Sequence, residues 1–280
     1  MERASSRGLI INLAPTGAVA TRLNSPHVPL SVEEIVRDSV EGIAAGASIV
    51  HIHARTESGA PTYRKDIYGK IVGGIRESRP DAIICVSLSG REFSAFEQRA
   101  DPLFLSNDLK PDMASLTLSS LNFARTASVN SPEMIVRLAS TMAERGIKPE
   151  LEVFDLGMMN YAKYLIKRNL LQRPFYFNII LGNVASAQAA PSHLGLLLSE
   201  LPEGSLWSAG GIGNAQLPMT AMGILYADGV RIGLEDCLWM DQQRQTLATN
   251  PGQVRRVEQL CNLLGREIAK PAEARVMLAI

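Results

Sequence analysis

Eight short runs of apolar and β-branched residues recur along the chain, and each is followed by turn-forming residues. Runs of this length and composition are typical of buried β-strands. The predicted strands are Leu9–Leu13, Ser48–Ala54, Ala82–Ser89, Met113–Leu118, Glu150–Phe154, Phe175–Leu181, Ser205–Ala209 and Gly229–Leu234. The pattern therefore predicts strands at intervals over the whole sequence.

The segments between these strands carry helical patterns. Ser31 followed by Glu34 has the spacing of a capping box, and apolar residues at helical spacing continue as far as Gly46, where we expect the helix to end. A capping residue directly before proline predicts two further helix starts, because proline favours the first helical position. These starts are Ser131-Pro132 and Asn250-Pro251.

Eight strands alternating with helices predict a (β/α)8 barrel, which is an α/β TIM barrel, as a single domain over residues 1–280. An open doubly wound sheet is the alternative. That fold usually places a glycine-rich phosphate loop after its first strand. Here the first strand runs into "APTGAVATR", which lacks the GxGxxG spacing, so the pattern favours the barrel.

Charge and cysteine content narrow the class of protein. The formal net charge is zero, so no basic field favours nucleic acid or a membrane surface as a partner. No apolar run has the length of a membrane span, and the N-terminal residues do not resemble a secretory signal. The three cysteines are widely separated and form no disulfide framework, so we expect a cytoplasmic protein.

Two of the four histidines stand one residue apart in "SIVHIHART". Because side chains alternate along a strand, His51, His53 and Arg55 share one face. Near the carboxyl end of a barrel strand, two inward imidazoles could hold one divalent metal, with nitrogen–zinc distances of about 2.0–2.1 Å. The alternative is a pair of buried histidines satisfied by ordinary hydrogen bonds.

The predicted last strand offers a third ligand. It continues as "GLEDCLW", which places Glu235 at the strand parity of Arg231 and leaves Asp236 at the strand end. Two histidines and one carboxylate leave open coordination positions, which suits Lewis-acid chemistry. The alternative is that Glu235 and Asp236 cap the next helix.

Other strand ends carry small polar residues that could contact a ligand. The third strand runs into "SLSGR", with Ser87 and Ser89 in the strand and the flexible Gly90 after it, and the fourth places Ser115 and Thr117 at strand parity. Residues of these types are often structural. His27 and His193 stand in poor positions for a metal site, which weighs against an amidohydrolase-type hydrolase, because that chemistry normally uses further histidines.

Several motifs together resemble the β-keto acid cleavage enzymes. They are "NLAPTGAVATR", "AGASIVHIHAR", "LSSLNFA", "ELEVFDLGM", "SAGGIGNAQLP" and "VRIGLEDCLW", and they occur in order over nearly the entire chain. The resemblance implies a zinc-dependent TIM barrel that assembles as a homo-oligomer, which we expect to be a homotetramer. It implies acyl exchange between a β-keto acid and acetyl-CoA, which yields acetoacetate and a new acyl-CoA.

The resemblance also assigns roles to residues. It implies that His51, His53 and Glu235 are the zinc ligands, and that Arg231, Asp236 and Ser87 form the catalytic group. Asp236 is the candidate base. A free aspartate has a pKa of about 3.9, so the metal is expected to acidify the carbon that loses its proton.

The position after the TGA motif bears on the substrate. Relatives that act on amino-bearing keto acids are expected to carry an acidic residue there, whereas this chain has Val19. We therefore expect a substrate without a positive amino group near its far end, bound with help from Val19, Gly90, Ser115 and Thr117. A metal-dependent aldolase that does not use CoA, and a barrel that only binds ligands, are the remaining alternatives.

Overall fold

The computed structural model describes residues 7–280, in which eight parallel strands close into a barrel. The first six residues of the predicted domain lie outside the described residues. Around the barrel the strands adopt the order β1-β12-β11-β10-β9-β6-β5-β2. Their bounds are β1 (Ile10–Leu13), β2 (Ile49–Ile52), β5 (Ile83–Val86), β6 (Met113–Thr117), β9 (Lys148–Val153), β10 (Phe175–Leu181), β11 (Ser205–Gly211) and β12 (Gly229–Ile232). Each overlaps one predicted strand, so the barrel prediction is confirmed.

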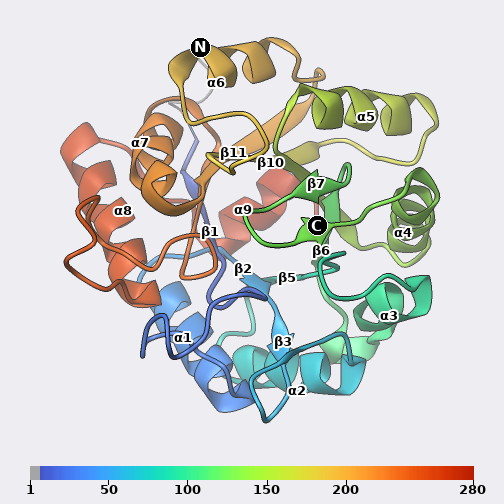
Figure 1. Cartoon of the computed structure of the whole chain (residues 1–280), viewed down its shortest axis with the longest axis horizontal. Helices are drawn as coiled ribbons and strands as arrows, with labels where there is room; N and C mark the ends of the chain where they lie inside the picture. The colour runs from blue at the N-terminus through green and yellow to red at the C-terminus, as the bar shows by residue number, and fades with distance from the viewer. Residues whose placement is uncertain (1–6) are drawn as a thin grey trace.

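Helices surround the barrel, as Figure 1 shows in a view down the shortest axis of the molecule. They are α1 (Val32–Ala44), α2 (Lys65–Ser78), α3 (Phe96–Ala100), α4 (Pro132–Glu144), α5 (Leu156–Lys167), α6 (Pro191–Ser199), α7 (Gln216–Tyr226) and α8 (Asn250–Leu264). A further helix, α9 (Pro271–Leu278), lies behind the strands near the centre of this view. In the part of the chain that the structure describes, none of these helices is long and apolar enough to cross a lipid bilayer.

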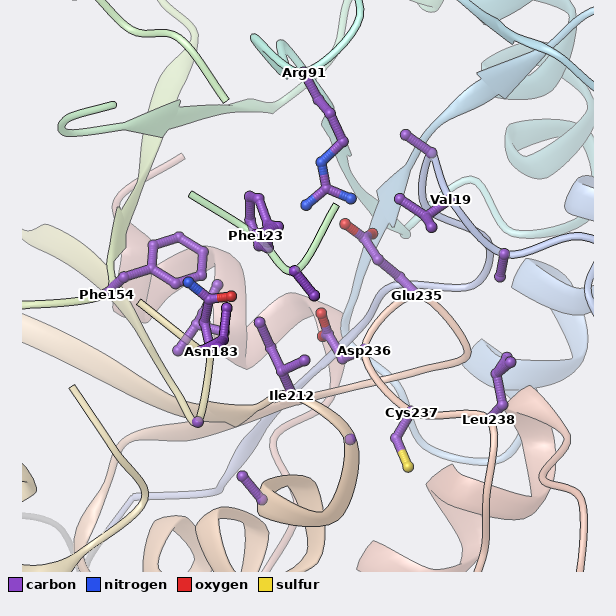
Figure 2. Close-up of a pocket in the computed structure, with 18 of the residues that line it drawn as sticks. Val19, Arg91, Phe123, Phe154, Asn183, Ile212, Glu235, Asp236, Cys237 and Leu238 are labelled. Atoms are coloured by element: carbon purple, nitrogen blue, oxygen red, sulfur yellow. The ribbon is translucent and has the colours of Figure 1, made fainter. Parts of the chain in front are cut away.

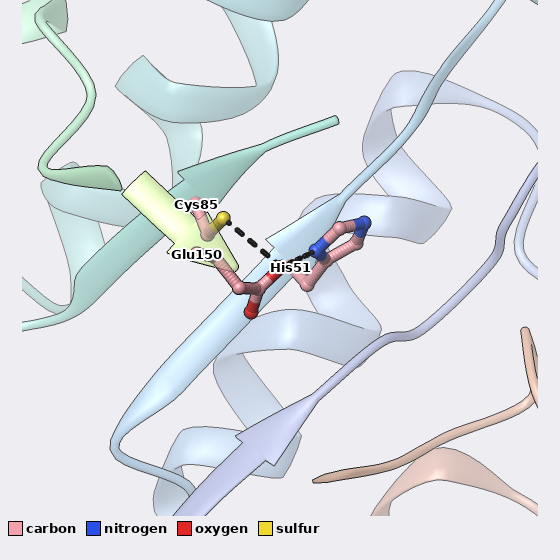
Figure 3. A group of neighbouring side chains, drawn as sticks. All are labelled: His51, Cys85 and Glu150. Atoms are coloured by element: carbon pink, nitrogen blue, oxygen red, sulfur yellow. Dashed lines mark hydrogen bonds and ion pairs between the residues drawn. The ribbon is translucent and has the colours of Figure 1, made fainter. Parts of the chain in front are cut away.

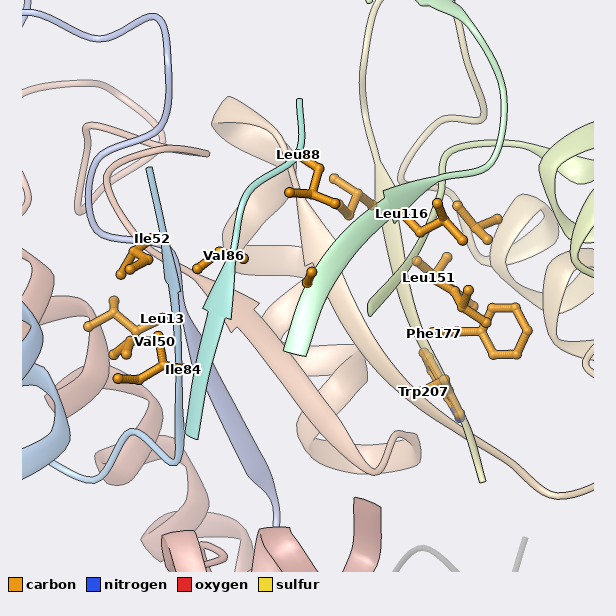
Figure 4. Close-up of a cluster of buried hydrophobic side chains, with 14 of the residues drawn as sticks. Leu13, Val50, Ile52, Ile84, Val86, Leu88, Leu116, Leu151, Phe177 and Trp207 are labelled. Carbon is orange, nitrogen blue, oxygen red and sulfur yellow. The ribbon is translucent and has the colours of Figure 1, made fainter. Parts of the chain in front are cut away.

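Alternation along the strands divides the buried residues into two sets. One set packs between the barrel and the surrounding helices, and Figure 4 shows part of it, including Leu13, Val50, Ile84, Leu151 and Phe177. The other set points into the barrel. Its apolar members, which include Ile10, Ile49 and Met113, pack with Ala274 and Leu278 of α9. The helix α9 therefore closes the end of the barrel where the strands begin.

Two of the predicted helix starts form as expected. The Ser31 side chain accepts a hydrogen bond from the backbone of Glu34, and the Glu34 side chain completes the capping box. The Ser131 side chain caps α4 by accepting a hydrogen bond from the backbone of Met134. The third start was wrong by one residue, because Thr249 caps α8. The Asn250 side chain instead accepts from Leu234 N and donates to Pro15 O, so it joins the segments that come after β1 and β12.

Two short hairpins extend the carboxyl ends of the barrel strands. One pairs β3 (Ala54–Arg55) with β4 (Pro61–Thr62), and the other pairs β7 (Leu121–Asn122) with β8 (Ala127–Ser128). Single 3₁₀ turns occur at Asp101–Phe104, Asn107–Leu109 and Gly213–Ala215. The β7–β8 hairpin and the strand ends together frame a large cavity.

Candidate active site

The two histidines lie where the strand alternation places them. His51 belongs to β2 and is 1% exposed, and His53 comes directly after that strand. Their ring centroids are 5.3 Å apart, so the two imidazoles are neighbours inside the barrel. Burial lowers the pKa of His53, which favours the neutral imidazole that a metal ion requires.

Glu235 meets both imidazoles. Its Oε1 lies 3.2 Å from His53 Nε2, and its Oε2 lies 3.8 Å from His51 Nε2. One ligand atom from each of the three residues lies within 4.8 Å of the other two. Among the described residues, Oε2 of Glu235 is buried without a hydrogen-bond partner. Two imidazole nitrogens and an unsatisfied carboxylate oxygen fit a divalent ion such as Zn²⁺.

A second cluster stands behind His51, formed with Cys85 and Glu150 (Figure 3). Glu150 Oε2 lies 2.6 Å from His51 Nδ1, and the Cys85 thiol lies 3.5 Å from the same oxygen. Burial raises the pKa of Cys85 well above its ordinary value, so the sulfur stays a thiol. A carboxylate that holds one ring nitrogen leaves the other nitrogen aimed at a metal. We therefore interpret this cluster as support for the first.

Arg231 forms ion pairs with the carboxylates of the site. It is 2% exposed, and its Nε lies 2.9 Å from Asp236 Oδ2. Its Nη2 is 3.1 Å from Glu235 Oε1, and its Nη1 is 3.4 Å from Glu152 Oε1 and 3.7 Å from Glu150 Oε2. One buried guanidinium thus holds four carboxylates together.

Burial and these contacts shift the pKa values of the four carboxylates in different directions. Burial alone would raise the pKa of Glu150, but His51 and Arg231 outweigh it and lower the value to about 2. The pKa of Glu235 is held well below its usual range in spite of burial, because His53 and Arg231 lie beside it. Burial prevails over Arg231 at Asp236 and Glu152, and it raises the pKa of both. Asp236 is thus a stronger base than a free aspartate.

Both Glu235 and Asp236 face the site because the chain turns there. The strand β12 ends at Ile232, two residues earlier than predicted. Glu235 therefore lies outside the strand, and the alternation of side chains along the strand does not explain its direction. Gly233 has φ +136°, and a Cβ at this position would come within 2.0 Å of the Ala14 carbonyl oxygen. The turn is held by the Gly233 N–H, which donates to Gln253, and by the Gly213 N–H, which donates to the Asp236 carbonyl.

The TGA segment borders the same turn. Gly17 has φ +65°, and a Cβ there would lie 2.6 Å from Cγ of Glu235. The inward residue Arg55 donates to the carbonyls of Gly17, Ala20 and Gly59. Arg55 therefore supports the loop that packs against Glu235.

A cavity of about 1280 Å³ opens above these residues (Figure 2). His53, Glu235 and Asp236 line it, together with Ser87 and Thr117 from two other strand ends. Thr117 donates a hydrogen bond of 2.6 Å to Glu152. Typical ligand pockets hold about 300–1,000 Å³, so this cavity has room for more than one small molecule.

The other predicted contact residues lie in different surroundings. Val19 lines the cavity and is 59% exposed. Ser115 is not among the described residues that line it, and its hydroxyl accepts from the backbone of Leu88. Gly90 is likewise absent from the lining, and a Cβ there would come within 2.4 Å of the Val129 carbonyl. Ser115 and Gly90 therefore shape the wall behind the cavity.

Comparison with known proteins identifies the family of this chain. The sequence profile described as "beta-keto acid cleavage enzyme" matches residues 8–280. The chain belongs to this family. A "3-keto-5-aminohexanoate cleavage enzyme" from Fusobacterium nucleatum is 39% identical over 274 residues, which cover 97% of this chain and 98% of that protein. The expected resemblance, and the expectation that the chain is an acyl-transferring enzyme, are confirmed.

Two further relatives show that the family includes more than one named activity. A "3-keto-5-aminohexanoate cleavage enzyme" from Acetoanaerobium sticklandii is 38% identical over 97% of this chain and 98% of its own length. A "3-oxoadipate:acetyl-CoA acetyltransferase" from Cupriavidus necator is 33% identical over 97% of this chain and 94% of its own length. The solved apo structure of ObcA has a TM-score of 0.81 and 22% identity, over 91% of this chain and 66% of that one, which supports the fold alone.

The site also contains residues that the sequence patterns do not predict. Glu150 is one of them, although it shares strand parity with Glu152 on β9, which is a signal in the sequence. Arg91 and Phe123 come from loops, for which alternation gives no indication. The other two histidines, His27 and His193, are not among the described residues that line the cavity.

Proposed function

We propose that this enzyme exchanges acyl groups between a β-keto acid and acetyl-CoA with the help of a zinc ion. The observation that carries the proposal is the convergence of His51, His53 and Glu235 beside Asp236 at the wall of a large cavity. The relatives named for acetyl-CoA-dependent transfer support it.

The ion would be held by His51 Nε2, His53 Nε2 and the Glu235 carboxylate. When bound, a Zn²⁺ ion supplies Lewis-acid chemistry, polarising a carbonyl and so acidifying the neighbouring carbon. Glu150 holds His51 from behind. The remaining steps depend on groups of the chain and of the two substrates.

Asp236 acts as the base that takes a proton from the carbon between the keto and carboxylate groups of the substrate. Arg231 Nε binds Oδ2 of Asp236 and leaves Oδ1 for the substrate, and it fixes the direction of proton transfer. The raised pKa of Asp236 strengthens the base. Because the same carboxyl then holds the proton, it can return it when the product carbanion forms.

The reaction needs no reactant other than the keto acid and acetyl-CoA. The carbanion attacks the acetyl carbonyl of acetyl-CoA and expels the CoA thiolate. The thiolate then attacks the original ketone, and the carbon–carbon bond beside that ketone breaks. Acetoacetate leaves after it regains the proton, and the rest of the keto acid leaves as its CoA thioester. Ser87 lines the cavity and can donate a hydrogen bond to oxygen atoms that gain charge.

Metal analysis and turnover test the proposal together. The purified enzyme should contain about one zinc per chain, and it should form acetoacetate from β-keto acids only when acetyl-CoA is present. Asp236→Asn should lower kcat by at least about 100-fold, within the usual contribution of a general base, while zinc content stays the same. Cleavage without acetyl-CoA would identify an aldolase instead, and normal turnover by the metal-free enzyme would refute the zinc assignment.

We also propose a homotetramer in the cytoplasm. The three cysteines are free and buried in the structure, which suits a reducing compartment. Light scattering coupled to size-exclusion chromatography measures the oligomeric state directly.

For the substrate, we propose a keto acid without a positive amino group at its far end. Val19 lines the cavity and offers no charge to an ammonium group. A clear preference for 3-keto-5-aminohexanoate over uncharged keto acids of similar length would contradict this.

A further inference from the structure

Arg91 presents an available positive charge to the cavity. It comes after β5 by way of Ser89 and Gly90, is half-buried and lines the cavity. Its guanidinium carbon lies 3.7 Å from the centre of the Phe123 ring. Stacking on the ring holds the guanidinium plane while leaving its N–H groups free at the edge, which is the geometry that binds a carboxylate with two hydrogen bonds.

The other buried arginines of this region already have acceptors. Arg231 is held by carboxylates and Arg55 by three backbone carbonyls. Arg99 donates to the carbonyls of Leu88 and Val129 and to the Asn130 side chain. Within residues 7–280, the Arg91 guanidinium contacts the Phe123 ring and forms no hydrogen bond or ion pair. Arg91 is therefore a half-buried cation of the cavity that a ligand can use.

The surroundings of Arg91 point to an anionic group. Burial lowers its pKa, which means that the charged form lacks part of its solvation. In the view of Figure 2, Glu235 lies between Arg91 and Asp236. Val19 lies at the same end of this row as Arg91. Four carboxylates act on the Arg91 charge from a distance and partly offset the effect of burial, namely Glu235, Glu152, Glu92 and Asp236. None of them forms an ion pair with Arg91 in the described part of the chain, and Val19 has no charge.

Asp236 and Arg91 lie in different parts of the cavity and can contact opposite ends of one substrate. The reacting carbon must reach Asp236, whereas Arg91 stands beyond Glu235, toward the side of the cavity where Val19 lies. We propose that Arg91 binds a second carboxylate at the far end of the keto acid, which makes the preferred substrates β-keto dicarboxylates. This inference rests on the proposed function and names the substrate class of the same site.

The test compares two keto acids that differ only at the far end: 3-oxoadipate, which ends in a carboxylate, and 3-oxohexanoate, which ends in a methyl group. The zinc-containing enzyme is assayed for acetoacetate with saturating acetyl-CoA. The wild type should prefer 3-oxoadipate in kcat/KM by about 10- to 100-fold, the range expected for a charged hydrogen-bonded pair. Arg91→Met, which keeps a side chain on Phe123, should remove most of this preference, mainly through KM.

Two further variants sharpen the result. Arg91→Lys keeps the charge without the paired hydrogen bonds and should retain part of the preference. Arg125→Met removes a cation from the exposed part of the hairpin that carries Phe123, and it should leave the ratio between the two acids as in the wild type. An equal loss of preference in Arg125→Met would mean that only the general field of the mouth matters, which overturns the proposal.

A binding measurement separates this inference from the proposed function. Adipate cannot react, and calorimetry should show that it binds the wild type at least tenfold more tightly than hexanoate does, and that Arg91→Met loses this difference. If the acids are not cleaved but adipate binding depends on Arg91, the proposed reaction fails and the anion site stands. If turnover proceeds with an unchanged preference in Arg91→Met, or if only the KM for acetyl-CoA rises, the anion site fails and the reaction stands.

Discussion

Replacing Glu150 with glutamine isolates the effect of its charge on the metal site. Glu150 is fully buried, and it accepts hydrogen bonds from His51 Nδ1 through one oxygen and from Asn12 Nδ2 through the other. Glutamine has the same shape. Its carbonyl can face His51 while its amide group faces Asn12, whose own Oδ1 is buried and has no partner in the described part of the chain. A flip of the Asn12 amide then satisfies the new donor.

The expected loss can be worked out from the bond that remains. The neutral bond from His51 to glutamine is roughly half as strong as the charge-assisted one, and it makes the imidazole a weaker ligand. Changes to groups that support metal ligands typically weaken metal binding by about 10- to 100-fold. This corresponds to about 1.4–2.8 kcal/mol of binding free energy. We expect Glu150→Gln to lose zinc affinity in this range.

Competition for zinc against a coloured chelator at neutral pH measures this affinity, and circular dichroism checks that the variant is folded. The matched control is Glu152→Gln, because Glu152 lies on the same strand and pairs with Arg231 but forms no hydrogen bond to either histidine. It should bind zinc within about threefold of the wild type, well short of the loss expected for a group that supports a ligand. A folded Glu150→Gln enzyme with wild-type affinity, or an equal loss in the control, would refute the reasoning.

Three more changes test other parts of the site. Gly17→Ala should destabilise the fold by about 1–3 kcal/mol and abolish zinc binding, because alanine is strained at φ +65° and its Cβ would displace Glu235. Arg231→Met should cost about 3–5 kcal/mol in the free energy of unfolding, because buried carboxylates lose their cation. The pKa of Asp236, already raised, should rise further, and a raised carboxyl pKa destabilises the folded state above the unfolded value. The deficit in Tm should therefore be larger at pH 8 than at pH 5. Val19→Glu should lower the preference for 3-oxoadipate over 3-oxohexanoate by about tenfold, because it supplies Arg91 with a carboxylate.

Each of these changes has its own control. Gly59→Ala also alters a residue at positive φ, +81°, and should lower Tm while zinc binding persists. If the decrease in Tm of Arg231→Met is the same at both pH values, lost packing rather than uncompensated charge causes the lower stability. Val19→Gln fills the same space as glutamate without charge and should keep the substrate preference.

Local patterns in the chain were enough to predict the barrel and the inward direction of the two histidines. Strand and helix periodicity are local properties, so alternation was enough to predict eight strands and to turn His51 and His53 inward. The family motifs could also be recognised from the sequence, because each is a continuous stretch of residues.

Which side chains contact one another depends on the closed barrel and could not be predicted from local patterns. Glu235 and Asp236 have opposite strand parity, yet both face the cavity because Gly233 ends the strand and turns the chain. His51 and Glu150 are 99 residues apart, and they come within hydrogen-bonding distance only once the barrel is closed. Arg91 stacks on Phe123 because two loops with no periodic pattern converge above the strands. Periodicity specifies the direction of a side chain, whereas its partners depend on closure, register and loop geometry, which are set by contacts distant in sequence.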